Sequence, residues 1–195
     1  MENVKITPRL VDVNGTPGIQ QGEIQEGDTF EVEFLFEDLV SDDNPNSTVL
    51  SGYTDLLFNP NRILLADDGI TYNSEYGRQQ TAQQDAIIEN NPGRLNEVGA
   101  VSNTLFGGGD LPSSQVVFTL TFEAQTDLSI TPVTIQSEKP DTPTEEIVIK
   151  GNQEEGISGD ESQVRNTEYD DLTIGPDVNI IESDGSTDVS EDGET

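Results

Sequence analysis

The chain of 195 residues contains no cysteine, no histidine and no tryptophan. Without cysteine it forms no disulfides or thiolate metal sites, and thiol catalysis is excluded. Without histidine it has no imidazole metal ligand and no histidine-based catalytic triad. The missing tryptophan removes the side chain that sugar-binding platforms use most. Carboxylate pairs of the glycosidase kind stay possible, but acids are so abundant that no pair stands out. We therefore expect no enzyme.

Basic residues are also scarce. Eight lysines and arginines stand against 39 aspartates and glutamates, which gives a net charge of −31 at pH 7. A surface this negative repels phosphate backbones and anionic lipids, so we expect neither nucleic-acid binding nor membrane-surface binding. It attracts cations instead. The charge is typical of a protein kept soluble in salty surroundings, and the same carboxylates are candidates for specific calcium sites.

No hydrophobic run approaches the length of a membrane span, so we expect no membrane insertion. The first residues, Met1-Glu2-Asn3, do not begin a signal peptide, and we expect any export signal to lie elsewhere in a longer protein. Hydrophobic residues make up 31% of the chain, and 18 glycines and 10 prolines are spread along it. This composition favours one domain of many strands joined by turns, with a thin two-layer core.

Two segments alternate between apolar and polar residues in the manner of half-buried antiparallel strands. The side chains expected to point inward are Phe30, Val32, Phe34 and Phe36 in the first segment, and Val116, Phe118, Leu120 and Phe122 in the second. Burial of three phenylalanines and a valine contributes on the order of 6–12 kcal/mol before the entropy of folding is subtracted. These two segments are expected to close the two facing layers.

The stretch from Ser51 to Gly69 predicts a strand, a tight turn and a second buried run. In the strand, Gly52, Thr54, Leu56 and Phe58 are expected on one face, and Tyr53, Asp55 and Leu57 on the other. Proline and asparagine at 59–61 favour a turn. The apolar run 63–65 should then return to the core, and Asp67-Asp68-Gly69 should end it.

The other expected elements are less distinctive. A strand over 4–13 contains Pro8 and should therefore border a sheet. One short helix is expected over 81–90, where apolar residues recur at helical spacing before Asn91-Pro92-Gly93. Further strands are expected at 70–72, 95–101, 128–135, 145–150 and 168–175, and polar loops at 41–47, 107–110 and 152–163. The predicted domain is 1–176, followed by an acidic flexible tail or linker over 177–195.

The order of these segments resembles that of cohesin domains. The resemblance is carried by a Gly-Asp turn before an alternating strand, EGDTFEVEFLF, and by a strand followed by a proline turn, GYTDLLFNPNRIL. Later segments that fit are VVFTLTFEA, ITPVTI and DDLTIG, so that the resemblance covers about residues 4–175. The helical segment at 81–90 and the acidic stretch after Lys150 depart from the family pattern.

Cohesins are bacterial jelly-roll sandwiches that dock partner modules in multiprotein assemblies. The resemblance implies an all-β, two-layer antiparallel β-sandwich of the jelly-roll type with one short helix, and a non-catalytic role in protein–protein docking or surface assembly. It also implies a protein partner, either dockerin-like or another surface component. The acidic tail resembles the opening of β-repeat modules in large bacterial surface proteins, so we expect an extracellular or cell-surface location.

Calcium is the one bound ion that the composition suggests. Calcium needs six to eight oxygen ligands that converge from loops. The clusters that could contribute are Asp12/Asn14, Asp42/Asp43/Asn44, Asp67/Asp68 and Asp110. None has EF-hand spacing, and ordinary solvated loop acids are the alternative. We select Asp67 and Asp68 as metal ligands, because the apolar run before them anchors their backbone, with Asp110 as a third.

Two other functions stay open at this stage. A carbohydrate-binding β-sandwich that takes a polysaccharide would need an aromatic platform, for which Tyr72 and Tyr76 are the nearest candidates; we interpret both as packing residues. A passive structural spacer in an adhesin would bind neither protein nor sugar. Binding to glycans would favour the first alternative, and capture of a protein partner would favour docking.

Overall fold

The computed structural model describes residues 4–17, 23–39, 47–76, 78–79, 93–103, 114–139, 148–152 and 167–176. These residues form β-strands, turns and loops, and none of them lies in an α-helix. The expected helix over 81–90, the loop over 107–110 and the tail over 177–195 lie outside the described residues. The acidic loop expected over 152–163 also lies outside them, apart from its first residue, Asn152.

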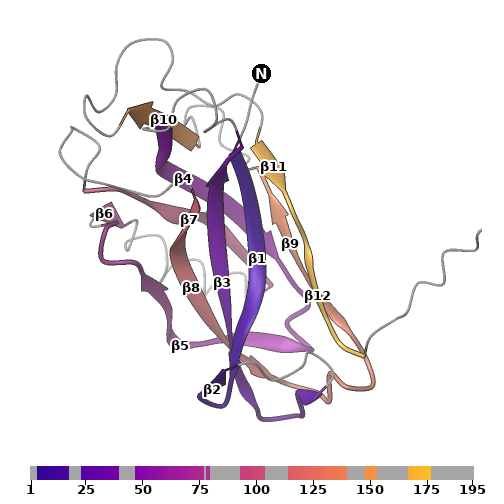
Figure 1. Cartoon of the computed structure of the whole chain (residues 1–195). Helices are drawn as coiled ribbons and strands as arrows, with labels where there is room; N and C mark the ends of the chain where they lie inside the picture. The colour runs from indigo at the N-terminus through magenta and orange to yellow at the C-terminus, as the bar shows by residue number, and fades with distance from the viewer. Residues whose placement is uncertain are drawn as a thin grey trace, which may run out of the picture.

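Two sheets of six strands each form the sandwich (Figure 1). The first sheet has the order β11-β1-β3-β8-β5, with β2 paired to β1, and the second has the order β12-β9-β4-β7-β6, with β10 paired to β4. The first sheet contains β1 (Val4–Val13), β2 (Thr16–Pro17), β3 (Thr29–Asp38), β5 (Ile63–Tyr72), β8 (Ser114–Ala124) and β11 (Thr167–Tyr169). The second contains β4 (Ser47–Leu57), β6 (Arg78–Gln79), β7 (Arg94–Val101), β9 (Val133–Glu138), β10 (Val148–Asn152) and β12 (Leu172–Ile174).

The predicted all-β, two-layer fold is confirmed, with one exception to its antiparallel pairing. β11 pairs with β1 in parallel over Val4–Ile6. Pro8 lies beyond this pairing, on the part of β1 whose backbone bonds only to β3. A residue without an N–H is tolerated there because no second neighbour needs its donor. The expectation that Pro8 lies at a sheet border therefore holds locally, although β11 covers the start of the strand.

The two phenylalanine-rich strands, β3 and β8, are neighbours in the first sheet and build most of the core. Phe30 stacks on Phe122 with ring centroids 5.7 Å apart, and Phe34 stacks on Phe118 at 4.6 Å. All four rings are almost completely buried. Offset stacking of this kind adds about 0.5–1.5 kcal/mol per pair to the burial of the rings. The predicted inward face of β3 is confirmed in full.

One inward residue of β8 was predicted wrongly. The pairing of β3 with β8 shifts between Phe34 and Leu35, so Phe34 faces Phe118 while Leu35 faces Val116. Val117 is the extra residue at this bulge and is completely buried, whereas Val116 is partly exposed. A bulge of one residue reverses which side chains point inward.

Other strand boundaries differ from the sequence prediction because of turns and bulges. β5 does not end at Asp67-Asp68-Gly69 but continues to Tyr72, with a register shift between Leu65 and Ile70. Asp68 has φ of 55°, which aspartate tolerates better than most residues. β9 begins at Val133 rather than 128, because residues 127–131 form a turn capped by Asp127. The predicted turn at 59–61 is confirmed, with Arg62 N donating to Asn59 O at 2.9 Å.

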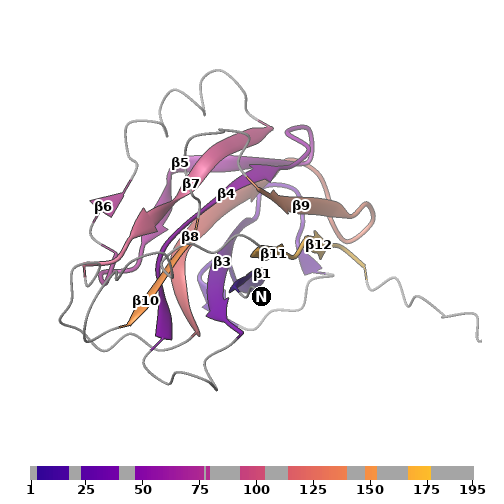
Figure 2. The ribbon, with the colours of Figure 1, turned by 90° about the horizontal axis from the view of Figure 1, so that it is seen from above.

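The expected final strand over 168–175 is two short strands in different sheets. β11 pairs with β1 and β12 pairs with β9, so the chain crosses from one layer to the other at Asp170 and Asp171. Asp170 accepts hydrogen bonds from Thr7 and Lys5, and Asp171 accepts one from Ser137 N. Seen from above, β11 and β12 lie between β1 and β9 (Figure 2). This segment therefore joins the two layers along one side.

Gly52 on β4 gives a direct test of how the sheets pack. A Cβ added there would lie 2.0 Å from Cε2 of the buried Phe36 ring. We expect Gly52→Ala to lower the free energy of unfolding by about 1–3 kcal/mol, because the ring has no space to move into. Phe36→Leu removes the clash, so the double variant should lose less than the sum of the two single losses in urea unfolding. Strict additivity would contradict the packing described here.

Candidate functional site

The outer face of the second sheet can be assigned from strand register, because residues directly opposite each other point to the same side. Leu57 lies opposite both Gln136 and Arg94, and Tyr53 lies opposite Gly99. Their neighbours Leu56 and Ile135 are completely buried in the core, so this row faces outward. Further along, the hydroxyls of Thr134 and Thr173 lie 3.0 Å apart on the same face.

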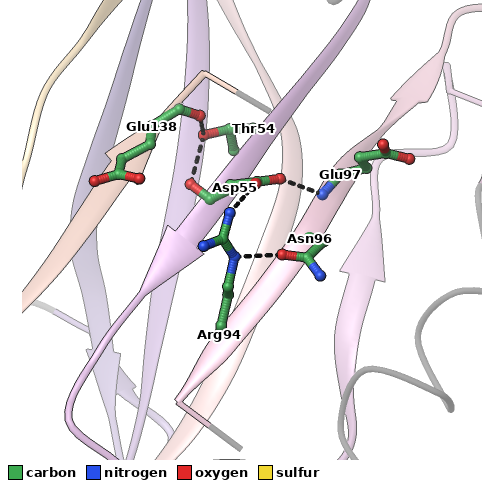
Figure 3. A network of polar contacts seen from close by, with 6 residues as sticks. All are labelled: Thr54, Asp55, Arg94, Asn96, Glu97 and Glu138. Atoms are coloured by element: carbon green, nitrogen blue, oxygen red, sulfur yellow. Dashed lines mark hydrogen bonds and ion pairs between the residues drawn. The ribbon is translucent and has the colours of Figure 1, made fainter. Parts of the chain in front are cut away.

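Asp55 occupies the centre of this face and is held by a network of polar contacts (Figure 3). Its Oδ2 accepts a hydrogen bond from Arg94 Nη2 at 2.7 Å, and its Oδ1 accepts one from Glu97 N at 2.7 Å. Arg94 also donates from Nε to Asn96 Oδ1. The network therefore fixes the Arg94 guanidinium in a plane against the sheet.

A bulge explains why Asp55 takes this position. Thr54 pairs with Val98 and Leu56 pairs with Leu95, so the single residue Asp55 faces two residues of β7. One of those two, Glu97, has φ of 54° and turns its N–H toward the carboxylate. The bulge thus frees a donor from the β-ladder, and Asp55 satisfies it.

Burial makes the Asp55 network strong. The residue is only 1% exposed, while the Arg94 side chain keeps 26% of its surface exposed. A buried carboxylate needs such partners, because its desolvation is otherwise very costly. The charge of Asp55 also affects Tyr169, whose ring packs against the core. Burial raises the pKa of the Tyr169 hydroxyl to about 12, and the Asp55 carboxylate adds to the increase.

Tyr53 is the aromatic residue of this face. It lies directly opposite Gly99, and a Cβ at Gly99 would come within 2.6 Å of the Tyr53 ring and 1.9 Å of the Gly52 carbonyl. Glycine is therefore required at position 99, and its lack of a side chain lets the ring lie close to β7. Tyr53 and Leu57 together give the face a partly exposed apolar centre beside Arg94.

The outer face of the first sheet is different in character. Its rows contain many glutamates, and Arg9 pairs with Glu33 through a salt bridge of 2.7 Å. Lys5 lies opposite Glu37 and is bound to Asp170, whose hydrogen bond and charge raise the pKa of Lys5. The glutamates on this face are Glu31, Glu33, Glu37, Glu123 and Glu168. Any partner docking here would have to remove water from several carboxylates.

The predicted calcium ligands lie in β5 of the first sheet or outside the described residues. Asp67 and Asp68 are exposed in the irregular part of β5, while Asp110 lies outside the described residues. Two carboxylates fall short of the six to eight oxygens that calcium takes. Among the described residues no group of three or more aspartates and glutamates is arranged to hold a metal ion. The calcium site therefore stays a prediction.

The other predicted clusters can be placed only in part. Asn14 uses its side chain in the fold: its Oδ1 accepts a hydrogen bond from Thr29 N, and its Nδ2 donates to Asp28 Oδ1. The cluster at 42–44 lies outside the described residues. Tyr72 and Tyr76 are packing residues as interpreted, because Tyr72 contacts the Phe118 ring and Tyr76 is completely buried with its hydroxyl donating to Val49 O.

Comparison with known proteins gives the fold a family likeness. No protein-family model and no curated protein sequence matches the chain. Among solved structures, the cohesin module of a family 33 glycoside hydrolase from Clostridium perfringens has a TM-score of 0.55 at 14% identity, covering 90% of this chain and 98% of that module. The chain has a cohesin-like fold. The resemblance seen in the sequence is thereby confirmed at the level of structure.

Two further matches were solved as complexes. CaCohA2 of Clostridium acetobutylicum, bound to a CaDoc0917 variant, has a TM-score of 0.52 at 12% identity, covering 89% of this chain and 99% of that chain. Coh-OlpA, in a type I cohesin–dockerin complex from Clostridium thermocellum, has a TM-score of 0.51 at 11% identity, covering 88% of this chain and 99% of that chain. At sequence identities this low, the two matches show a shared fold only.

Sequence reasoning missed the Asp55 network. The alternation of β4 placed Asp55 correctly on the same face as Tyr53 and Leu57 but gave no sign that it is buried. The only signal was an aspartate inside an otherwise uncharged strand. Its partners Arg94 and Glu97 lie 39 and 42 residues further along the chain. Their meeting depends on the bulge, which cannot be read from either strand alone.

Asp55→Asn tests this network. The variant keeps the shape of the side chain but removes the charge and turns an amide donor toward a donor on Arg94 or Glu97. We expect the free energy of unfolding to fall by about 3 kcal/mol, at the lower end for a broken buried pair because Arg94 can reach water. Urea unfolding in the presence of a calcium chelator measures the loss, with the exposed Asp67→Asn as the matched control, expected to stay within about 0.5 kcal/mol of the parent. Similar losses in both variants would show that Asp55 has no special role.

Proposed function

We propose that this module is a non-catalytic docking domain that binds a partner protein through the outer face of its second sheet. The observation that carries the proposal is the cohesin-like fold together with the composition of this face. A similar structure, Coh-OlpA, binds a dockerin in its complex, and CaCohA2 is also found in complex. A dockerin-like module is accordingly the partner class that we propose for this chain.

The charges of the two faces favour the second sheet. Protein interfaces are poor in charged residues at their centre and rich in tyrosine and arginine. The centre of the second sheet's outer face has Tyr53, Leu57 and Arg94. Asp55 beside them is neutralised by Arg94, and Glu138, opposite Asp55 on β9, is an exposed carboxylate of this face. The glutamate-rich face of the first sheet offers no comparable centre. Docking on the second sheet therefore removes water from fewer unpaired charges.

The fixed Arg94 gives this face a specific contact. An arginine presents several donors in a rigid plane, and Asp55 and Asn96 hold that plane in place before any partner arrives. Preorganisation of this kind reduces the side-chain entropy lost on binding. We propose that Arg94 and the adjoining Leu57 form the centre of the interface, with Thr134, Thr173 and Gln136 at its rim.

A location outside the cell fits this role. Within the described residues no helix is long and apolar enough to cross a membrane. The strongly negative charge suits a protein that works in salty surroundings. We propose that the module acts as part of a secreted or cell-surface protein and takes part in surface assembly. For polysaccharide binding, the two tyrosines that the sequence suggested as a platform, Tyr72 and Tyr76, both pack inward. A passive spacer in an adhesin is distinguished from docking by the binding experiment below.

Leu57→Glu tests the docking face. The change puts a charge at the proposed centre, so affinity for a dockerin-like partner should fall by at least about tenfold, equal to about 1.4 kcal/mol. The measurement is calorimetric titration against the dockerin-like modules encoded by the same organism. Leu35→Glu is the matched control, because Leu35 is a partly exposed leucine on the outer face of the first sheet.

Two outcomes of that titration, and one of a glycan-array experiment, would count against the proposal. Equal affinities of the Leu57 and Leu35 variants would show that the partner does not use the second sheet. A loss confined to Leu35→Glu would move the interface to the first sheet. Binding of the parent module to a glycan array, with no binding to any dockerin-like module, would favour the carbohydrate-binding alternative.

Calcium binding at Asp67 and Asp68 is a separate proposal. If these carboxylates and Asp110 hold calcium in the folded state only, the ion should raise the melting temperature, because a ligand that binds the native state stabilises it. Melting is compared with calcium and with chelator at a fixed high salt concentration, which keeps general screening constant. The double variant Asp67→Asn/Asp68→Asn should lose the difference. Identical curves for the parent with and without calcium would rule the site out.

A further inference from the structure

The hairpin between β1 and β2 contains a sequence pattern for the attachment of sugar. The residues Asn14-Gly15-Thr16 form the triplet Asn-x-Ser/Thr, which is the acceptor pattern for N-linked glycans in exported proteins. Val13 pairs with Thr16, so Asn14 and Gly15 form a two-residue turn. Their φ values of 51° and 73° are those of the type I′ turn that Asn-Gly favours.

Exposure makes this triplet accessible in the folded protein. Asn14, Gly15, Thr16 and the following Pro17 are all exposed. β2 lies on the β1 edge of the first sheet, at one end of the sandwich (Figure 1), away from the outer face of the second sheet. A bulky group on Asn14 would therefore extend into solvent and leave the proposed docking face open.

The hydrogen bonds of Asn14 are compatible with modification. Nδ2 carries two hydrogens and donates one to Asp28 Oδ1 at 2.7 Å, while Oδ1 accepts from Thr29 N at 2.9 Å. An N-linked sugar replaces only one of the two Nδ2 hydrogens. The bond to Asp28 and the bond from Thr29 can therefore both persist, and the turn stays anchored to β3 after modification.

The chain offers an internal comparison. A second triplet, Asn46-Ser47-Thr48, begins at a residue outside the described part. The two differ in charge: Asp12 stands two positions before Asn14, whereas Asn44 holds that position before Asn46. The two triplets therefore compare, on one chain, an acceptor that follows a carboxylate with one that does not.

We propose that Asn14 is an N-glycosylation site of the exported protein, with a sugar carried on a lipid diphosphate as the donor. The Nδ2 of Asn14 attacks the anomeric carbon of the sugar. The new C–N bond forms as the C–O bond to the diphosphate breaks, the diphosphate leaves with the electron pair, and Nδ2 gives up one proton to a base of the transferring enzyme. Pro17 fixes the backbone φ directly after the triplet and so reduces the freedom with which a transferring enzyme can bind the segment.

Mass spectrometry of the protein exported by its own organism tests the site. Cleavage before aspartate gives the peptide Asp12–Gly27, which contains Asn14, separately from Asp43–Thr54, which contains Asn46. The expected result is a sugar mass on Asn14, located by electron-transfer fragmentation. An increase of about 1 Da alone would be deamidation at the Asn14-Gly15 bond, and that result, or an unmodified peptide, would overturn the proposal.

Variants of Thr16 separate enzymatic recognition from simple exposure. Thr16→Ala removes the hydroxyl that completes the triplet and should abolish the sugar, whereas Thr16→Ser should retain it. Neither change touches the hydrogen bonds of Asn14, so urea unfolding should be the same for both. Pro17→Ala should raise the modified fraction. Persistence of the sugar in Thr16→Ala would overturn the proposal, and none of these results bears on docking by the second sheet.

Discussion

The fit of the first sheet's phenylalanines against small residues of the second sheet fixes the rest of the structure. The Phe36 ring occupies the space that a side chain at Gly52 would need, and Ala100, opposite Gly52, is equally buried. Protein interiors are close-packed, so the two sheets cannot slide without placing a side chain on a ring. Because Gly52 must face inward, Tyr53 must face outward. The core thus decides which residues the outer face of the second sheet presents.

Much of this core could be predicted from alternation alone, since the period of two belongs to each strand by itself. The inward face of β3 was predicted correctly for that reason. The prediction that Val116 points inward was wrong, because the bulge opposite Leu35 depends on how β3 and β8 pair. The prediction of one final strand was wrong for a related reason. Asp170 and Asp171 lie between two short strands, and only their contacts with Lys5 and Ser137 N show that the layer changes there.

The candidate site depends still more on pairing. Asp55 alone in a strand suggests an exposed charge, and only the opposing bulge with Glu97 turns it into a buried acceptor. The position of Arg94 in turn depends on Asp55. Each residue of such a site is unremarkable in the sequence, because the site is held by hydrogen bonds between residues of neighbouring strands. By contrast, the acidic pairs that stand out in the sequence, such as Asp67 and Asp68, are exposed and show no such partners among the described residues.

The large negative charge and the nature of the outer face are related. Among the described residues, Lys5, Arg9 and Arg94 each form an ion pair with a carboxylate of the same chain. These three cations therefore offset negative charge within the fold. A chain with a charge of −31 repels acidic proteins at low salt, and this repulsion reaches about 10 Å at 0.1 M salt but only about 3 Å at 1 M. The apolar part of the proposed interface, Leu57 and Tyr53, relies on the burial of apolar surface, which screening does not weaken. Salt that suppresses the repulsion between the two surfaces therefore leaves these apolar contacts of the proposed interface intact.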